Sequence, residues 1–194
     1  PEPEVVAAVE SAARALEAAG AIVEPAPAFL APAMLDGICA FFEARSHADV
    51  AAMAPEVGAM ILPFIVEWCM HRARNFTGAD VVAAYGQVMA MRDAAVRATA
   101  RFDFLLMPTT PVVSWGAEQH SPSDDPHDAL SHIAFTVAFN MSEQPAASVP
   151  WTHSADGLPI GVQVAGQRFD DLGVLRLSRA LELLRPPLRP WPQP

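Results

Sequence analysis

Two short apolar segments near the end of the chain most constrain its fold. They are AASVP at 146–150 and IGVQVAG at 160–166, and the loop between them carries Asp156 and Gly157. Apolar runs of this length are typical of buried strands, and Asp-Gly tolerates the positive φ angles of a chain reversal. Prolines bound both segments, where their missing backbone donor helps to end a strand. We therefore predict two buried strands in a hairpin-like pair.

Helical patterns alternate with further strand patterns along the rest of the chain. Apolar residues recur at helical spacing, or good helix formers dominate, over 4–19, 34–53, 59–73, 77–100 and 170–185. A shorter helix is expected from Asp128 or Leu130 to Met141. Two more short apolar runs predict strands at 21–24 and 103–106. This order is typical of an α/β fold, with one mixed sheet and helices on both of its faces.

Three motifs carry a resemblance to a known family. They are FN-x-x-x-QPA-x-SVP at 139–150, DGLPIGVQVAG at 156–166 and RFDFLLMPTTP at 101–111. Together they resemble the C-terminal part of the amidase signature enzymes, and the helices before them match more loosely. The resemblance implies the α/β fold of that family. It also implies a serine hydrolase that cleaves carboxamides with a Ser, a cis-Ser and a Lys.

The catalytic groups that this resemblance implies are absent from the chain. All 12 basic residues are arginines, and the sequence contains neither a lysine nor two adjacent serines. In the family these groups lie in the N-terminal half. We therefore interpret residues 1–194 as a single α/β unit that forms the C-terminal portion of a larger amidase, without catalytic residues of its own. The chain would contribute scaffold and part of the substrate pocket.

The resemblance also indicates where a substrate would bind. It places Ile133, Phe139, Asn140 and Gln144 as lining of the substrate pocket. Glutamine-dependent amidotransferases of the family tend to carry an acid where Ile133 stands, so we expect a small amide with an uncharged acyl group. Ser142 and Glu143 replace a Thr-Gly pair that is usual in relatives. If the turn needs a positive φ there, Glu143 adopts it at a cost of roughly 1 kcal/mol.

Composition excludes several other classes of function. A net charge of −10 argues against nucleic acid and against an anionic membrane surface. The longest apolar run, 57–66, is about half as long as a membrane span and contains Pro63. Cys39 and Cys69 lack metal-site spacing and are expected as buried, reduced thiols. No basic leader precedes an apolar stretch, so we predict a cytoplasmic protein without cofactors.

Two alternatives remain beside the amidase interpretation. The first is a non-catalytic α/β domain that binds or interacts through the same scaffold. The second is a metal-dependent hydrolase that uses the His- and Asp-rich loop at 120–132, although neither H-x-x-x-H nor H-E-x-x-H occurs there. If the chain is half of an enzyme, its cut sheet should leave open edges and apolar surface. We then expect it to form homo-oligomers or to bind the missing N-terminal half.

Overall fold

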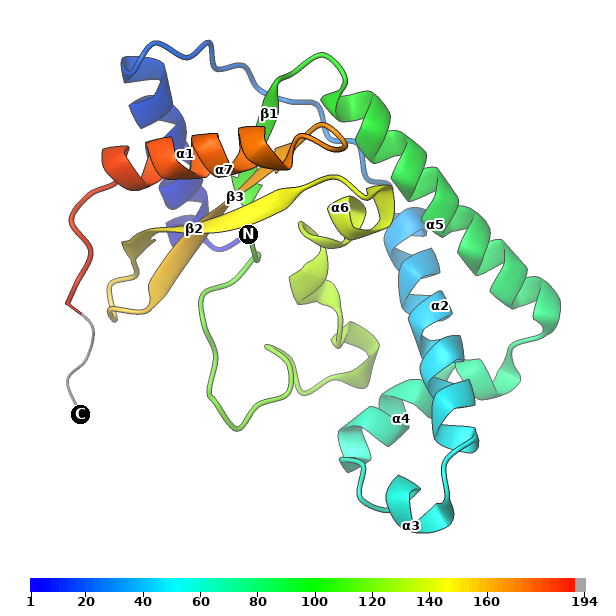
Figure 1. Ribbon diagram of the computed structural model, residues 1–194. Helices are drawn as coiled ribbons and strands as arrows, with labels where there is room; N and C mark the ends of the chain where they lie inside the picture. Colours follow the sequence, from blue (N-terminus) through cyan, green and yellow to red (C-terminus); the bar gives the residue numbers. More distant parts are fainter. Residues whose placement is uncertain (191–194) are drawn as a thin grey trace.

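A three-stranded antiparallel sheet forms the centre of the computed structural model, which describes residues 1–190 (Figure 1). Its strands are β1 (Phe104–Pro108), β2 (Ala146–His153) and β3 (Pro159–Gly166), in the spatial order β1-β3-β2. The α/β class is confirmed. The predicted mixed sheet is wrong, because both strand pairs in the described chain are antiparallel.

The hairpin predicted from the two apolar segments is confirmed. Val149 of β2 pairs with Val162 of β3, and a bulge interrupts the register between Pro150 and Thr152. The connection turns at Gly157, whose φ of 85° is accessible to glycine at little steric cost. Both strands are longer than predicted, because the residues next to the turn also pair with each other.

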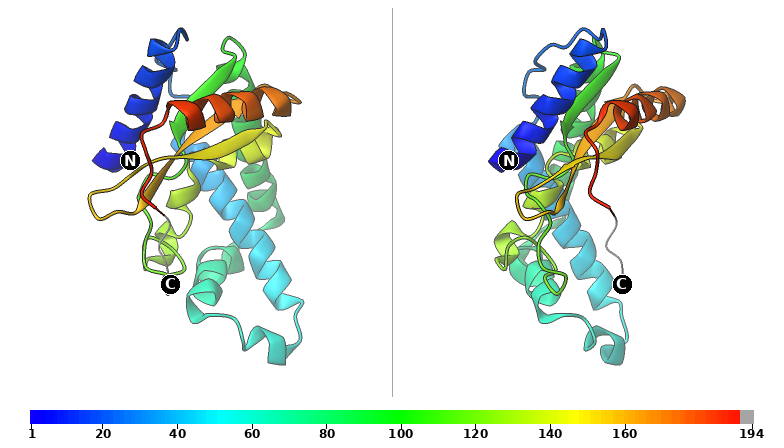
Figure 2. Two further views of the ribbon diagram at one scale, coloured as in Figure 1. Left: turned by 60° about the vertical axis from the view of Figure 1, so that its left-hand side comes forward. Right: turned by 90° about the vertical axis from the view of Figure 1, so that its left-hand side faces the viewer.

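One face of the sheet packs against the first and last helices, α1 (Pro3–Ala18) and α7 (Asp171–Leu184) (Figure 2). Alternate residues of a strand point to the same face, so Val162 and Val164 meet both helices on one side. This cluster is the largest in the core; its fully or nearly buried members are Val5, Ala8, Ala12, Val149, Trp151, Ile160, Val162, Val164, Val174 and Leu181.

The opposite face is only partly covered. The short helix α6 (Val137–Ser142) places Phe139 against Leu105 and Ala165 of the sheet. On β2, however, Ala146 and Ser148 are exposed on this side. Helices therefore lie on both faces, as predicted, but the expectation that 146–149 is buried on both faces is wrong at the edge strand.

A helical arm extends away from the sheet (Figure 1). Its long helices α2 (Pro32–Ala51) and α5 (Gly78–Thr99) pack through Ile38, Val88 and Met91. A Cβ at Gly37 would lie 2.3 Å from the Gln87 Cβ, so glycine at this position permits the close approach. The remaining helices of the arm are α3 (Pro55–Gly58), α4 (Pro63–His71) and the 3-10 turn η1 (Ala73–Asn75).

A buried ion pair fixes α4 to α2. The Glu43 carboxylate is 3% exposed, and its Oε1 accepts from Arg72 Nη2 at 2.7 Å. Arg72 also donates to Asp36, and the hydrogen bond to Glu43 is the main cause that raises the pKa of the guanidinium. The Arg72 side chain therefore joins the end of α4 to α2. Removing Arg72 would leave the buried Glu43 carboxylate without a compensating charge, which is strongly destabilising.

Two predicted elements differ from the structure. Residues 21–24 do not form a strand; the segment is exposed, with Ile22 91% accessible. Its apolar pattern is that of a strand, but no described strand lies beside it to accept its backbone hydrogen bonds. The helix expected from Asp128 or Leu130 to Met141 is reduced to 3-10 turns and α6. In the first case the strand pattern has no neighbouring strand to pair with. In the second case the helical pattern is too short for one long helix.

The two cysteines are free, as predicted, although only Cys69 is fully buried and Cys39 is half-buried. Burial raises the pKa of both thiols above the ordinary value. Within residues 1–190, no helix combines the length and the apolar character that a membrane span requires.

The N-terminus of α5 should respond to acid. A capping box is present there: Asp80 Oδ2 accepts from Thr77 N at 2.7 Å and from Thr77 Oγ1, while Thr77 Oγ1 accepts from Asp80 N. These bonds lower the pKa of Asp80. A lowered folded-state pKa stabilises the fold above the unfolded value of about 3.9, and this stabilisation disappears as pH falls through the folded pKa.

We therefore expect Asp80→Asn to lower the free energy of unfolding at pH 6, and we expect this difference to shrink as the pH falls below the unfolded value of about 3.9. Urea unfolding at several pH values measures this. Asp103→Asn is the matched control, because Asp103 is exposed and accepts no hydrogen bond in the described chain. An equal loss for Asp80→Asn at every pH would contradict the linkage.

Candidate functional site

The motif-rich segment at 131–145 lies between the sheet and the arm. It consists of the 3-10 turn η3 (Ser131–Ile133), then α6, then the turn that leads into β2. α6 contacts α5 of the arm and also packs on the sheet. This segment contains all four side chains expected to line a substrate pocket, so their placement decides what the segment can do.

The four predicted pocket residues occupy three environments. Phe139 is 1% exposed and packs edge-on against Phe29, with ring centroids 6.4 Å apart. Gln144 is 6% exposed and fully hydrogen-bonded within the chain. Ile133 packs against the α2–α5 cluster and is half-buried, whereas Asn140 is exposed. The fold brings all four into one short segment, and Asn140 and Ile133 are the members that a ligand could reach directly.

Gln144 joins three separate parts of the fold. Its Nε2 donates to Thr99 Oγ1 at the end of α5 at 2.9 Å and to the Gly166 carbonyl of β3 at 2.8 Å. Its Oε1 accepts from Ser142 Oγ of α6 at 2.9 Å. Each of these polar groups is buried, so each would be costly to leave unpaired. The amide therefore holds α6 in a fixed relation to the sheet and to the arm.

A second glutamine supports the other end of the segment. Gln163 of β3 is 3% exposed, and its Nε2 donates to the Phe135 carbonyl at 2.8 Å. This residue was not among those predicted from the sequence. A signal was present, because Gln163 is the one amide side chain within the apolar run 160–166. A polar side chain in a buried strand needs a partner, and here that partner is the backbone just before α6.

The turn after α6 adopts a left-handed conformation at Glu143. Its φ of 60° and ψ of 29° confirm the positive φ considered for this position. Arg92 of α5 binds the Glu143 carboxylate with two bonds of 3.1 Å each. Arg168 donates from Nε to the Ser142 carbonyl at 2.6 Å. The Glu143 side chain therefore ties the left-handed turn to α5.

The serines in and near the segment lack the environment of a nucleophile. Ser142 is fully buried and donates to Gln144. The Ser148 hydroxyl lies 2.7 Å from Thr109 Oγ1. Over residues 1–190, neither hydroxyl has a histidine or a carboxylate as its hydrogen-bond partner. General-base activation of either serine has no group to perform it.

The histidines of the 120–132 loop each pack against an aromatic ring. His120 lies 3.5 Å from Phe64 and His127 lies 3.6 Å from His71, measured between ring centroids. His132 packs edge-on against Trp115 at 5.4 Å. In the described part of the chain, no three His, Cys, Asp or Glu side chains gather closely enough to hold a metal ion. The loop, including the 3-10 turn η2 (Pro126–Asp128), anchors on α4 instead.

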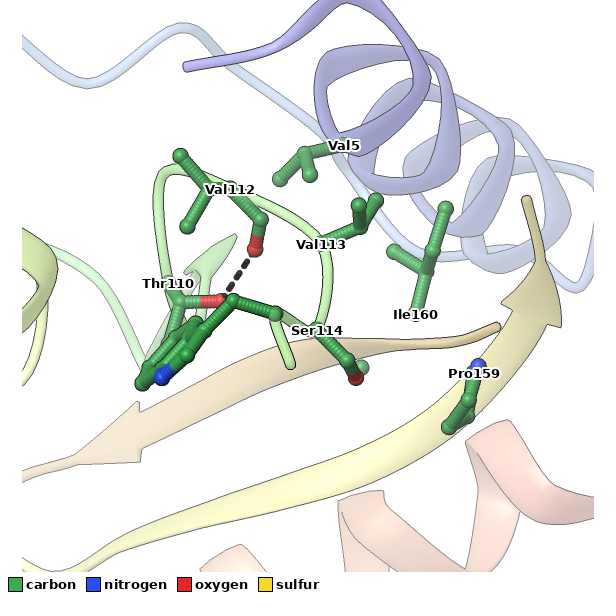
Figure 3. A pocket seen from close by; sticks show the side chains of 9 residues that line it. Val5, Thr110, Val112, Val113, Ser114, Pro159 and Ile160 are labelled. Atoms are coloured by element: carbon green, nitrogen blue, oxygen red, sulfur yellow. Dashed lines mark hydrogen bonds between the residues drawn. The ribbon is translucent and has the colours of Figure 1, made fainter. Parts of the chain in front are cut away.

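Two cavities lie outside the 131–145 segment. The smaller, about 140 Å³, lies between α1, the loop after β1 and the start of β3, and all its lining side chains are uncharged (Figure 3). Thr110 Oγ1 is not free there, because it donates to the Val112 carbonyl at 2.7 Å. The larger, about 590 Å³, lies at the far end of the arm beside α3 and α4. Neither is lined by Ile133, Phe139, Asn140 or Gln144.

Comparison with known proteins finds one family. The family model described as Amidase matches residues 1–175. A glutamyl-tRNA(Gln) amidotransferase subunit of Myxococcus xanthus (strain DK1622) is 30% identical over 204 residues, which cover 93% of this chain and 42% of that protein. An acylamidase of Rhodococcus erythropolis is 33% identical over 121 residues, or 60% of this chain and 25% of that protein. The chain thus spans less than half the length of these relatives.

Solved structures have the same fold over nearly the whole chain. A 6-aminohexanoate cyclic dimer hydrolase, solved with its substrate, matches with a TM-score of 0.77 at 28% identity, over 95% of this chain and 42% of that one. A bacterial aryl acylamidase of the amidase signature enzymes matches with a TM-score of 0.78 at 25% identity, over 94% and 40%.

The left-handed turn at residue 143 should be more stable with glycine than with alanine. Glu143→Gly and Glu143→Ala both remove the ion pair with Arg92, so they differ mainly in the cost of positive φ. That cost is about 1 kcal/mol for a residue with a Cβ. Urea unfolding should find Glu143→Gly more stable than Glu143→Ala by this amount. Equal stabilities would mean that the turn relaxes to another conformation.

The Gln144 network should be costly to break. Gln144→Leu keeps a similar volume but removes the buried hydrogen bonds to Ser142, Thr99 and Gly166. We expect a loss of about 2–3 kcal/mol in the free energy of unfolding. Gln87→Leu is the control, since Gln87 is half-buried and makes no side-chain hydrogen bond in residues 1–190. Similar losses for the two variants would refute a special role for Gln144.

Proposed function

Because the chain belongs to the Amidase family, we propose that it is the C-terminal portion of an amidase-type hydrolase that acts on carboxamide bonds. In this proposal the 194 residues contribute scaffold and part of the substrate pocket to an enzyme whose N-terminal half lies outside this sequence. The product would be a carboxylic acid, with ammonia or an amine released. A location in the cytoplasm stays a prediction.

The observation that carries the proposal is the family match over residues 1–175, in a sequence that has no lysine and no adjacent serines. The serines near the motif support the same view, because Ser142 is buried and Ser148 lacks a base. In the complete enzyme, a serine of the other half would attack the amide carbonyl and expel the amine. Water would then hydrolyse the acyl-enzyme. Backbone donors would stabilise the oxyanion.

Within that reaction, the role proposed for this chain is to shape the acyl side of the pocket. Asn140 is exposed, and its amide can both donate to and accept from a substrate. Ile133 is half-buried and uncharged, which favours an uncharged acyl group over an amino acid. Phe139 would pack beneath the pocket as part of its wall. Gln144 would hold α6 in position.

A second candidate is a self-contained binding domain. One observation favours it: the hydrogen bonds of Gln144, Gln163 and Arg168 close entirely within this chain. The segment around α6 thus reaches a satisfied structure without a second half. A binding domain would hold a small amide without converting it.

We predict that the purified chain does not hydrolyse amides or p-nitrophenyl esters. Catalysis without a nucleophile is reduced to binding and electrostatic effects. The measurement is turnover of a panel of aryl and alkyl amides, with and without the N-terminal half encoded by the same gene. Activity only in the mixture supports the proposal.

Two results would count against it. A serine-directed reagent that both abolishes activity of the isolated chain and labels Ser142 or Ser148 would show a nucleophile here. If the gene encodes no lysine and no paired serines before this sequence, the binding domain is the better interpretation. Asn140→Ala should then weaken binding of the amide. Asn75→Ala is the control, because Asn75 is an exposed residue of the 3-10 turn η1 in the arm.

A further inference from the structure

Residues 131–136, which lead into α6, form few hydrogen bonds to the rest of the fold. Their backbone runs through turns, and its hydrogen bonds reach residues only three or four positions away. The hydroxyls of Ser131 and Thr136 also donate to carbonyls three residues earlier. Such short-range bonds define the shape of a turn but not its place on the sheet. The apolar contacts of Ile133 with the α2–α5 cluster are not directional either.

One hydrogen bond joins this segment to the sheet. Gln163 Nε2 of β3 donates to the Phe135 carbonyl at 2.8 Å, across 28 residues of sequence. Among the described residues, no backbone N–H donates to that carbonyl. No other hydrogen bond there joins 131–136 to a residue more than four positions away. The place of the segment on the sheet therefore depends on one side-chain amide.

The packing of β3 does not explain why residue 163 is a glutamine. Gln163 is 3% exposed, and its neighbours Val162 and Val164 are fully buried. An amide loses its bonds to water in such a place, so an apolar side chain would suit the strand at least as well unless the amide finds a partner. The same Nε2 lies 3.5 Å from the Pro108 carbonyl at the end of β1. The glutamine is explained by its link between the sheet and the entry to α6.

Thr136 connects the anchored Phe135 to Ile133. The Ile133 carbonyl accepts from Thr136 N at 2.9 Å and from Thr136 Oγ1 at 3.1 Å. These two bonds close the turn that contains Phe135. A shift of the Phe135 carbonyl is therefore transmitted to Ile133, which the proposed function places at the acyl side of the pocket.

We propose that Gln163 and Thr136 are positioning residues that set, through Ile133, which length of uncharged acyl group the enzyme accepts. This inference rests on the proposed function, in which Ile133 borders the acyl group. Gln163 and Thr136 act without touching the substrate. A small displacement of a pocket wall is enough, because one methylene more or less in an apolar pocket changes kcat/KM by roughly 10–200-fold.

Acyl selectivity tests the inference. The substrates are p-nitroanilides of acetyl to hexanoyl groups, and the enzyme is the chain combined with the N-terminal half encoded by the same gene. Gln163→Met keeps the side-chain length but cannot donate, so the ratio of kcat/KM between the best and the worst acyl group should fall by roughly ten-fold. Ile133→Ala should also change this ratio. Thr136→Val should lower it as Gln163→Met does, whereas Thr136→Ser keeps the hydroxyl and should retain it.

Gln167→Met is the matched control for the loss of a buried amide bond. Gln167 Nε2 donates to the Thr99 carbonyl at 2.6 Å and to the Phe102 carbonyl at 3.0 Å, which lie outside the 131–136 segment. Gln167→Met should lower the stability of the chain but leave the selectivity ratio unchanged. On the isolated chain, Gln163→Met should speed amide hydrogen exchange in 131–136 by about ten-fold, since local opening becomes easier, and Gln167→Met should not.

Two results would overturn the inference while the proposed function stands. In the first, the combined halves are active and Ile133→Ala changes the ratio, but Gln163→Met does not. In the second, Gln163→Met and Gln167→Met lower the ratio equally, which would be a general effect of stability. Wild-type halves without activity, or a ratio that Ile133→Ala leaves unchanged, would refute the proposed pocket and this inference with it. Hydrogen exchange would still show whether Gln163 holds the segment.

Discussion

The side-chain amide of Gln144 is the contact on which the arrangement of sheet, arm and α6 depends. It reaches the end of α5, the last residue of β3 and the last residue of α6 at once. All of these groups lie out of water, where an unmet donor or acceptor costs more than a formed hydrogen bond contributes. The amide thus specifies one relative placement of three elements that hydrophobic packing alone would leave less well defined.

The turn beside Gln144 shows how this placement is maintained without a glycine. Glu143 has a left-handed backbone conformation, which costs free energy for a residue with a Cβ. Its carboxylate meets Arg92, and the preceding carbonyl accepts from Arg168. One contact ties the turn to α5, and the other ties it to the segment after β3. Strain at the end of α6 is therefore offset by contacts that also orient the helix.

Helices cover one face of the sheet, whereas the other face is only partly covered. α1 and α7 bury Val162 and Val164 fully, while α6 covers only the β1 and β3 part of the reverse side. Ala146 and Ser148 remain exposed, and so does the extended segment around Ile22. This asymmetry is consistent with a chain that spans 42% of a family relative.

The sequence by itself determined those features whose cause is local. Asp-Gly between two apolar runs specified the hairpin, and Thr77 and Asp80 specified the start of α5. Only the tertiary structure decided that 21–24 remains unpaired, that Phe139 and Gln144 are buried, and that three loop histidines pack on aromatic rings. The reason is physical: a turn or a cap is satisfied by residues a few positions away. A strand, a buried amide or an aromatic contact needs a partner that is distant in sequence, and Gln144 to Thr99 spans 45 residues.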